Sequence, residues 1–118
     1  MNPHHDPYAH LPLREVELSV LLSVVDRPRH GYAILQEADE RSGGRPGFEI
    51  PTLYRALRRM RKDGLIRPAK APPAEAEEDA RREYWQATAL GGRVLAAELR
   101  RLEVLLAAGR ARVAEASA

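Results

Sequence analysis

The sequence predicts a mostly helical chain with a small two-stranded sheet, in the order helix, helix, helix, strand, strand, helix. Three observations carry this prediction. Apolar residues group into four segments that suit helices, glycine and proline clusters separate the early segments, and one stretch late in the chain alternates as strands do. The length of 118 residues corresponds to one domain of ordinary size.

Composition excludes several classes of protein. A hydrophobic content of 44% with 31% charged residues is unlike a disordered or collagen-like chain. The absence of cysteine excludes disulfides, thiolate metal sites and a cysteine nucleophile. No apolar run is long enough to cross a bilayer, and the polar first ten residues do not resemble a signal peptide. We therefore expect a cytoplasmic protein with no membrane partner.

The first half of the chain predicts an arm and two helices. Residues 1–12 carry three histidines and three prolines and predict a flexible N-terminal arm, with too few ligands for a metal site. Residues 13–25 predict a largely buried helix, which ends before Pro28 because the residue preceding a proline resists helical geometry. Residues 30–41 predict a second helix, which the glycine and proline cluster at 42–47 ends.

The third helix has two unlike faces. It is predicted to begin at Pro51, a residue favoured in a first helical turn, and to end at Gly64. At helical spacing one face is apolar, with Leu53, Leu57 and Met60. The reverse face is cationic, with Arg55, Arg58, Arg59 and Lys62. Residues 51–67 hold six cations and one acid, a local balance of +5 in a chain whose net charge is only +2. Cations without neighbouring acids repel one another, so this face predicts an anionic partner.

The first of the two predicted strands begins directly after Gly64, and the second occupies residues 82–88. Between them, residues 71–80 are rich in proline, alanine and acids, which is typical of a mobile hairpin tip. The acids of the tip would be repelled by DNA, whereas Arg81 and Arg82 at its base could lie over a groove or phosphates. Trp85 is interpreted as a core or interface residue, with stacking on a ligand as the alternative.

A final helix is predicted over residues 89–116, capped by Thr88. Its leucines recur at spacings of four, three and four and form a narrow apolar seam: Leu95, Leu99, Leu102 and Leu106. A narrow seam on a terminal helix suits contact with a second chain, so we expect a homodimer.

A basic helix that follows another helix across a turn is typical of a recognition helix in the major groove. We therefore predict a winged helix-turn-helix DNA-binding domain at 13–88 and a dimerisation helix at 89–118. The predicted DNA-binding residues are Thr52, Tyr54, Arg55, Arg58, Arg59, Lys62, Arg81 and Arg82. A helical module that binds an acidic partner protein is the alternative. No set of residues suits catalysis, a metal or another cofactor, so we do not expect an enzyme.

Four phrases together resemble the PadR-like transcriptional regulators over roughly residues 11–108. They are His30-Gly31-Tyr32, Pro51-Thr52-Leu53-Tyr54-Arg55-Ala56-Leu57, Asp63-Gly64-Leu65-Ile66 and Tyr84-Trp85-Gln86-Ala87-Thr88-Ala89-Leu90-Gly91. The resemblance implies a homodimer, usually a repressor, that binds a pseudo-palindromic double-stranded DNA operator and releases it on sensing a small molecule or stress. The single short last helix is similar to that of the compact members, in which an effector would bind at the dimer interface. Pro51 departs from the glycine that is common there, and the acidic tip departs from a DNA-binding wing.

Overall fold

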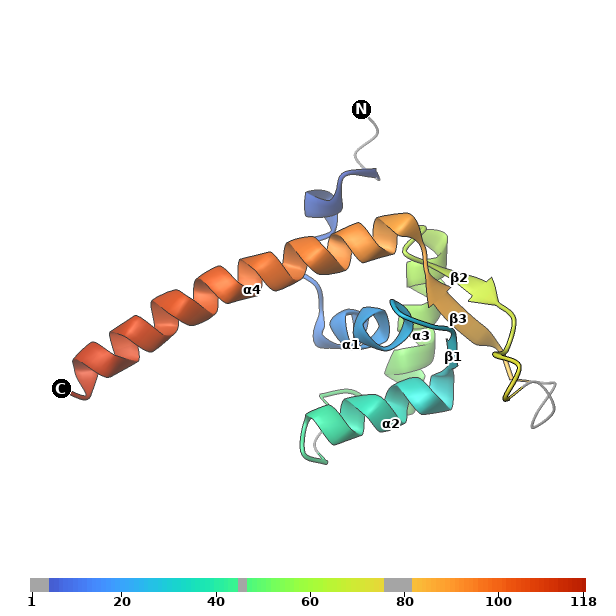
Figure 1. Ribbon diagram of the computed structural model, residues 1–118, viewed down its shortest axis with the longest axis horizontal. Helices are drawn as coiled ribbons and strands as arrows, with labels where there is room; N and C mark the ends of the chain where they lie inside the picture. The colour runs from blue at the N-terminus through green and yellow to red at the C-terminus, as the bar shows by residue number, and fades with distance from the viewer. Residues whose placement is uncertain (1–4, 45–46, 76–81) are drawn as a thin grey trace.

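The computed structural model describes residues 5–44, 47–75 and 82–118, and it confirms a mostly helical fold with a small sheet (Figure 1). A body of three helices carries the sheet on one side, and a long last helix extends away from it. The elements in chain order are η2 (Pro7–His10), α1 (Glu15–Val24), β1 (Arg29–His30), α2 (Gly31–Arg41), α3 (Ile50–Lys62), β2 (Ile66–Ala69), β3 (Tyr84–Ala87) and α4 (Ala89–Ala116).

The sheet has three antiparallel strands in the order β1-β3-β2, one more than the two that the sequence predicts. The additional strand β1 has only two residues and pairs Arg29 with Trp85 and His30 with Tyr84. Two residues cannot display alternation, so only the pairing with β3 reveals this strand. β1 joins the hairpin of β2 and β3 directly to the start of α2.

The core lies around α1, whose Val20, Leu21 and Val24 are fully buried. The predicted apolar face of α3 packs there, since its Leu53, Leu57 and Met60 are also fully buried. Trp85 of β3 belongs to the same cluster, which confirms its interpretation as a core residue. The reverse face of α3 is consequently held outward by the packing of its apolar face.

The start of α4 is fixed to the turn after α3 by hydrogen bonds and by close packing. Thr88 Oγ1 accepts from the backbone N–H of Gly91 at 3.0 Å, which confirms the predicted cap. The same hydroxyl donates to the carbonyl of Gly64 at 2.6 Å. A Cβ at Gly91 would lie 2.0 Å from the carbonyl oxygen of Leu65, so only glycine permits this approach.

The predicted N-terminal arm is described only from residue 5 onward, and this part contains a short helix packed on the body of the chain. Asp6 caps η2, which lies against α4 (Figure 1). The segment that follows is held by Glu98 of α4, whose buried Oε2 accepts from the backbone N–H of Leu13 at 2.7 Å. A hydrogen bond from Arg101 and the one from Leu13 hold the pKa of Glu98 below its ordinary value, although burial acts in the opposite direction.

Candidate nucleic-acid interface

The outer face of α3 presents three exposed cations, Arg55, Arg58 and Lys62. None of the three has an ion pair with any residue that the structure describes. Arg55 lies within 3.4 Å of the hydroxyl of the half-buried Thr52, one turn earlier on the helix. These four side chains therefore form one polar surface, which we call the α3 basic face.

Arg59, which the sequence groups with these cations, differs from them because it has an ion pair within the chain. Its Nε lies 3.6 Å from Oε2 of Glu17 on α1. Arg59 is on the flank of α3 one turn from the buried Ala56, so its side chain reaches toward α1 while it remains 37% exposed. Glu17 also accepts from the backbone N–H of Arg14 at 2.9 Å and is held in place at the start of α1.

Two further cations of the basic segment make contacts within the chain. The guanidinium of Arg61 lies over the ring of the buried Trp85, 5.9 Å from its centroid, which is a cation–π arrangement. Arg67 of β2 donates to Oε1 of Gln86 on β3 at 3.1 Å. The six cations of this segment therefore divide into three that contact other elements of the chain, of which Arg61 and Arg67 are still exposed, and the three of the α3 basic face.

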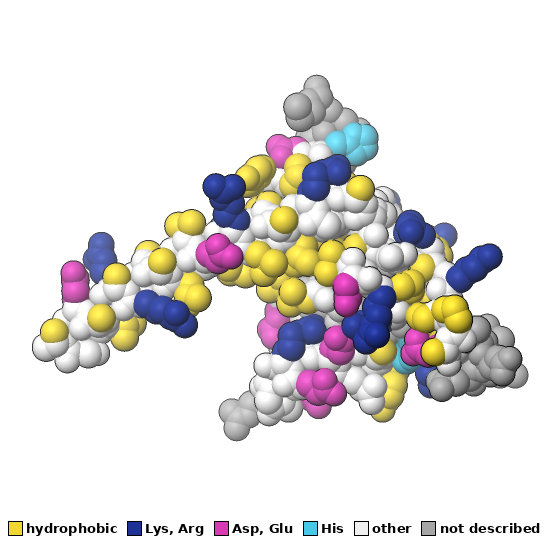
Figure 2. All heavy atoms as spheres, in the orientation of Figure 1, with side chains coloured by type: hydrophobic (Ala, Val, Ile, Leu, Met, Phe, Trp, Pro, Cys, Tyr) yellow, Lys and Arg dark blue, Asp and Glu magenta, His cyan; other side chains and the backbone are white. Residues whose placement is uncertain are grey.

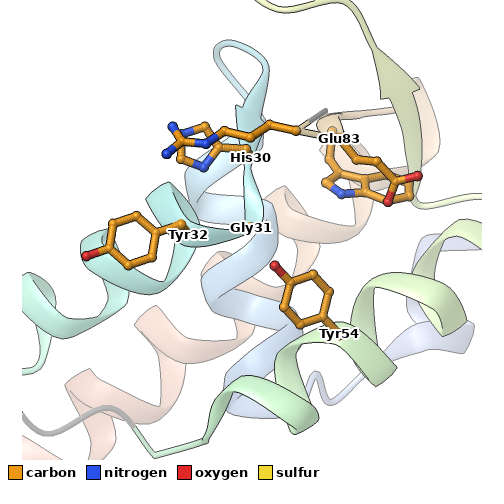
Figure 3. A pocket seen from close by; sticks show the side chains of 7 residues that line it. His30, Gly31, Tyr32, Tyr54 and Glu83 are labelled. Carbon is orange, nitrogen blue, oxygen red and sulfur yellow. The ribbon is translucent and has the colours of Figure 1, made fainter. Parts of the chain in front are cut away.

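A hollow of about 480 Å³ opens beside the α3 basic face, where the N-terminus of α2 meets α3 and β3 (Figure 3). Its lining residues are His30, Gly31, Tyr32, Tyr54, Arg82, Glu83 and Trp85. A Cβ at Gly31 would lie 3.0 Å from the phenol oxygen of Tyr54, so glycine lets this ring approach the start of α2. Tyr32 and Tyr54 are both exposed, and their hydroxyls are available to donate to a bound anion.

His30 and Arg82 lie next to each other in the lining of this hollow. His30 Nδ1 accepts from the backbone N–H of Ala33 at 3.1 Å and so caps α2. Arg82 Nη1 lies 3.1 Å from Nε2 of the same ring. A helix N-terminus beside a guanidinium and two phenols is suited to a phosphate, while Glu83 opposes it with one negative charge.

The sequence predicts Tyr54 and Arg82 as binding residues, and the structure brings them together in the hollow. His30 and Tyr32, which also line the hollow, are not predicted from the sequence. The sequence carries no clear signal for His30 as a cap, because the predicted helix begins at residue 30 and histidine is not one of the usual capping residues. Arg81, the neighbouring predicted contact, lies outside the described residues, as does most of the acidic tip.

The apolar seam of α4 is exposed only in part. Leu95 is 5% exposed and packs in the core of its own chain, so it is not available to a second chain as the sequence predicts. Leu99 is 39% and Leu106 53% exposed, and Leu102 between them is half-buried. Figure 2 shows hydrophobic side chains continuing along the part of α4 that projects from the body. The open seam therefore begins at Leu99.

Other kinds of site find no support in the part of the chain that the structure describes. No group of three or more histidine, aspartate or glutamate side chains is placed to hold a metal ion among these residues. None of the described helices is long and apolar enough to cross a membrane.

The fold and its outward basic helix define a winged helix-turn-helix of the kind found in transcription regulators. Residues 20–97, about two thirds of the chain, match the family model described as "Transcriptional regulator PadR-like family". The chain belongs to this family, which is a family of transcription regulators and not of enzymes.

Solved structures share the fold. A PadR family transcription regulator from Clostridium difficile R20291 is 21% identical with a TM-score of 0.70, over 85% of this chain and 99% of that one. A PadR family regulator from Eggerthella lenta DSM 2243 is 27% identical with a TM-score of 0.59, over 85% and 81%. The adhesin competence repressor from Streptococcus pyogenes is 12% identical with a TM-score of 0.63, over 92% and 72%. A search of curated proteins finds no match.

Proposed function

We propose that this chain is a homodimeric, sequence-specific DNA-binding repressor whose α3 enters the major groove of an operator. The observation that carries the proposal is the α3 basic face: Arg55, Arg58 and Lys62 point outward without an acid partner among the described residues. Arginine matches guanine in a bidentate geometry, and lysine supplies charge to phosphates. Thr52 and Arg55, near the start of α3, would read base edges.

The hollow at the N-terminus of α2 supports this orientation on DNA. With α3 in the groove, the flanking phosphate would lie at the start of α2, where Tyr32, Tyr54 and Arg82 can donate to it. These contacts carry no sequence information, but they fix the register of α3 on the duplex. Arg81 is proposed to act with Arg82 at the base of the hairpin.

The projecting part of α4 supports a homodimer. The seam of Leu99, Leu102 and Leu106 is only partly covered by its own chain, and an identical helix is its natural complement. Two subunits related by a two-fold axis would read two half-sites about one helical turn apart, hence a pseudo-palindrome. Repression, with release by a small molecule or stress signal, is the mode that the family resemblance implies.

Selection of bound fragments from genomic DNA, followed by footprinting, tests the proposal. The expected result is protection of a short inverted repeat, lost in the double variant R55A/R58A and kept in R110A, which removes an exposed cation from distal α4. A partner protein bound to the basic face would give no footprint. Failure to protect any inverted repeat would overturn the proposal.

A further inference from the structure

A second groove lies on the far side of Tyr32, between α2 and the segment that leads into α3. It has a volume of about 530 Å³. One wall is a single face of α2, with residues at helical spacing: Tyr32, Leu35, Gln36 and Asp39. The other wall is four consecutive residues: Phe48, Glu49, Ile50 and Pro51. The groove therefore lies in the helix-turn-helix itself, away from the exposed seam of α4.

The walls of this groove are mainly apolar. Leu35 and Phe48 pack against or within the core, and Ile50 is 53% exposed although it is a large aliphatic side chain. The ring of Tyr32 is likewise exposed at the end shared with the neighbouring hollow. A pocket of this size with apolar and aromatic walls is typical of sites for small organic molecules.

The charge of the groove is negative, in contrast to the neighbouring α3 basic face. Among the described residues that line it, the ionisable groups are Asp39, Glu49 and the phenol of Tyr32, and both carboxylates are exposed. Glu49 precedes α3 at the N-cap position, yet its side chain makes no capping hydrogen bond. Neither carboxylate has an ion pair within the described ranges. Two acids without an ion pair to any described residue, beside aromatic rings, favour a cation.

We propose that this groove binds an organic cation with an apolar body, and that the bound cation excludes DNA. The exclusion of DNA rests on the proposed function. Tyr32 belongs both to the groove and to the hollow assigned to a phosphate, and Ile50 and Pro51 form the first turn of the helix assigned to the major groove. A molecule that covers these residues occupies space that the duplex needs. The effector site would then lie outside the dimer interface.

Calorimetric titration of the full chain without DNA tests binding. The probes are tetraphenylphosphonium and tetraphenylborate, which share size and shape and differ in the sign of charge. Tetraphenylphosphonium should bind the wild type and bind D39N/E49Q about fivefold more weakly, because two exposed charge interactions are lost. E40Q, which removes an exposed acid of α2 outside the groove, should bind as the wild type does. Tetraphenylborate should not lose affinity in D39N/E49Q.

Equal affinity of tetraphenylphosphonium for the wild type and D39N/E49Q, or no binding to the wild type, would overturn the groove assignment. Amide shifts in a nitrogen–proton correlation spectrum locate the probe. Shifts at Leu35, Phe48 and Ile50 support the groove, whereas shifts confined to α4 would overturn it and favour a site along that helix.

Operator binding with and without the probe tests exclusion. Saturating tetraphenylphosphonium should weaken operator binding of the wild type at least tenfold, and at the same concentration it should affect D39N/E49Q less. Unchanged operator affinity with the groove occupied would overturn exclusion and leave binding standing. A chain that binds no operator at all would overturn the proposed function, while the calorimetric result still decides the groove.

Discussion

Arg59 Nε of α3 lies 3.6 Å from Oε2 of Glu17 on α1. The contact joins the helix assigned to DNA recognition to the central helix of the core. Both side chains are partly exposed, so the ion pair contributes at most about 1 kcal/mol to stability. Its main effect is on the orientation of Arg59. The ion pair holds the guanidinium toward α1, whereas helical spacing alone assigns this side chain to the DNA-facing surface.

This pairing predicts unequal effects of two neighbouring arginines. R58A should weaken operator binding at least fivefold, since a lost arginine contact costs about 1–3 kcal/mol. R59A should weaken it less than twofold, because Arg59 is engaged with Glu17. Fluorescence anisotropy with labelled operator measures both. Equal losses would show that Arg59 leaves Glu17 to reach DNA.

Salt dependence counts the cations that reach phosphates. With Arg58, Lys62 and Arg82 of each of two subunits on phosphates, log K should fall with log salt at a slope of about −5. K62A should reduce the magnitude of this slope by about 2, because each dimer loses two contacts. R110A serves as the control and should leave the slope unchanged. A slope that K62A does not alter would remove Lys62 from the interface.

The close approach of α4 to the chain after α3 predicts a large effect of one methyl group. G91A should lower the free energy of unfolding by about 2–3 kcal/mol, because the new Cβ would meet the carbonyl oxygen of Leu65 at 2.0 Å. G92A is a matched control on the same helix, since nothing outside the adjacent helix backbone lies within 4 Å of its Cβ position. It should be neutral or stabilising by up to about 1 kcal/mol. Urea denaturation at a fixed protein concentration measures both.

The buried Glu98 predicts a defined pH dependence of stability. Its pKa is lowered in the folded chain, chiefly by the hydrogen bond from Arg101, so the folded state favours the charged carboxylate. This contribution is complete above the unfolded pKa of about 4.3 and is lost as the pH falls through the lower folded value. E98Q should therefore be less stable than the wild type at pH 7, and the difference should shrink below pH 4.

Urea denaturation of the two proteins between pH 3 and pH 7 measures this difference. E103Q, at an exposed position of the same helix, should show no such trend. A stability difference that stays constant across this range would mean that Glu98 acts by its shape and hydrogen bonds rather than by its charge.

The exposed seam of α4 predicts that the chain forms a homodimer through this helix. L99E/L102E should sediment as a monomer in analytical ultracentrifugation, because two charges would be buried between identical helices. V104E places the same charge on another side of α4, at a residue that is 66% exposed, and should remain a dimer. A dimeric L99E/L102E would show that another surface holds the subunits together.

Much of the architecture follows from local sequence. The apolar face of α3, the cap at Thr88 and the glycine and proline clusters each specify an element from neighbouring residues alone, and the structure contains all of these elements. The cationic reverse face of α3 follows from the same spacing. The sequence also directs Trp85 to the core, because a large aromatic ring on a strand is usually buried there.

The packing of the chain decides which of these side chains already contact another part of the chain and which remain exposed. Arg59 forms an ion pair with Glu17, and Leu95 is buried in the core of its own chain. The strand β1 exists only through its pairing with β3, and the groove with Asp39 and Glu49 exists only where α2 meets the start of α3. Helical and strand spacing are properties of a single segment, so sequence determines them. The contacts of a side chain and its exposure to solvent depend on segments far apart in the chain, so they are set only when the chain packs.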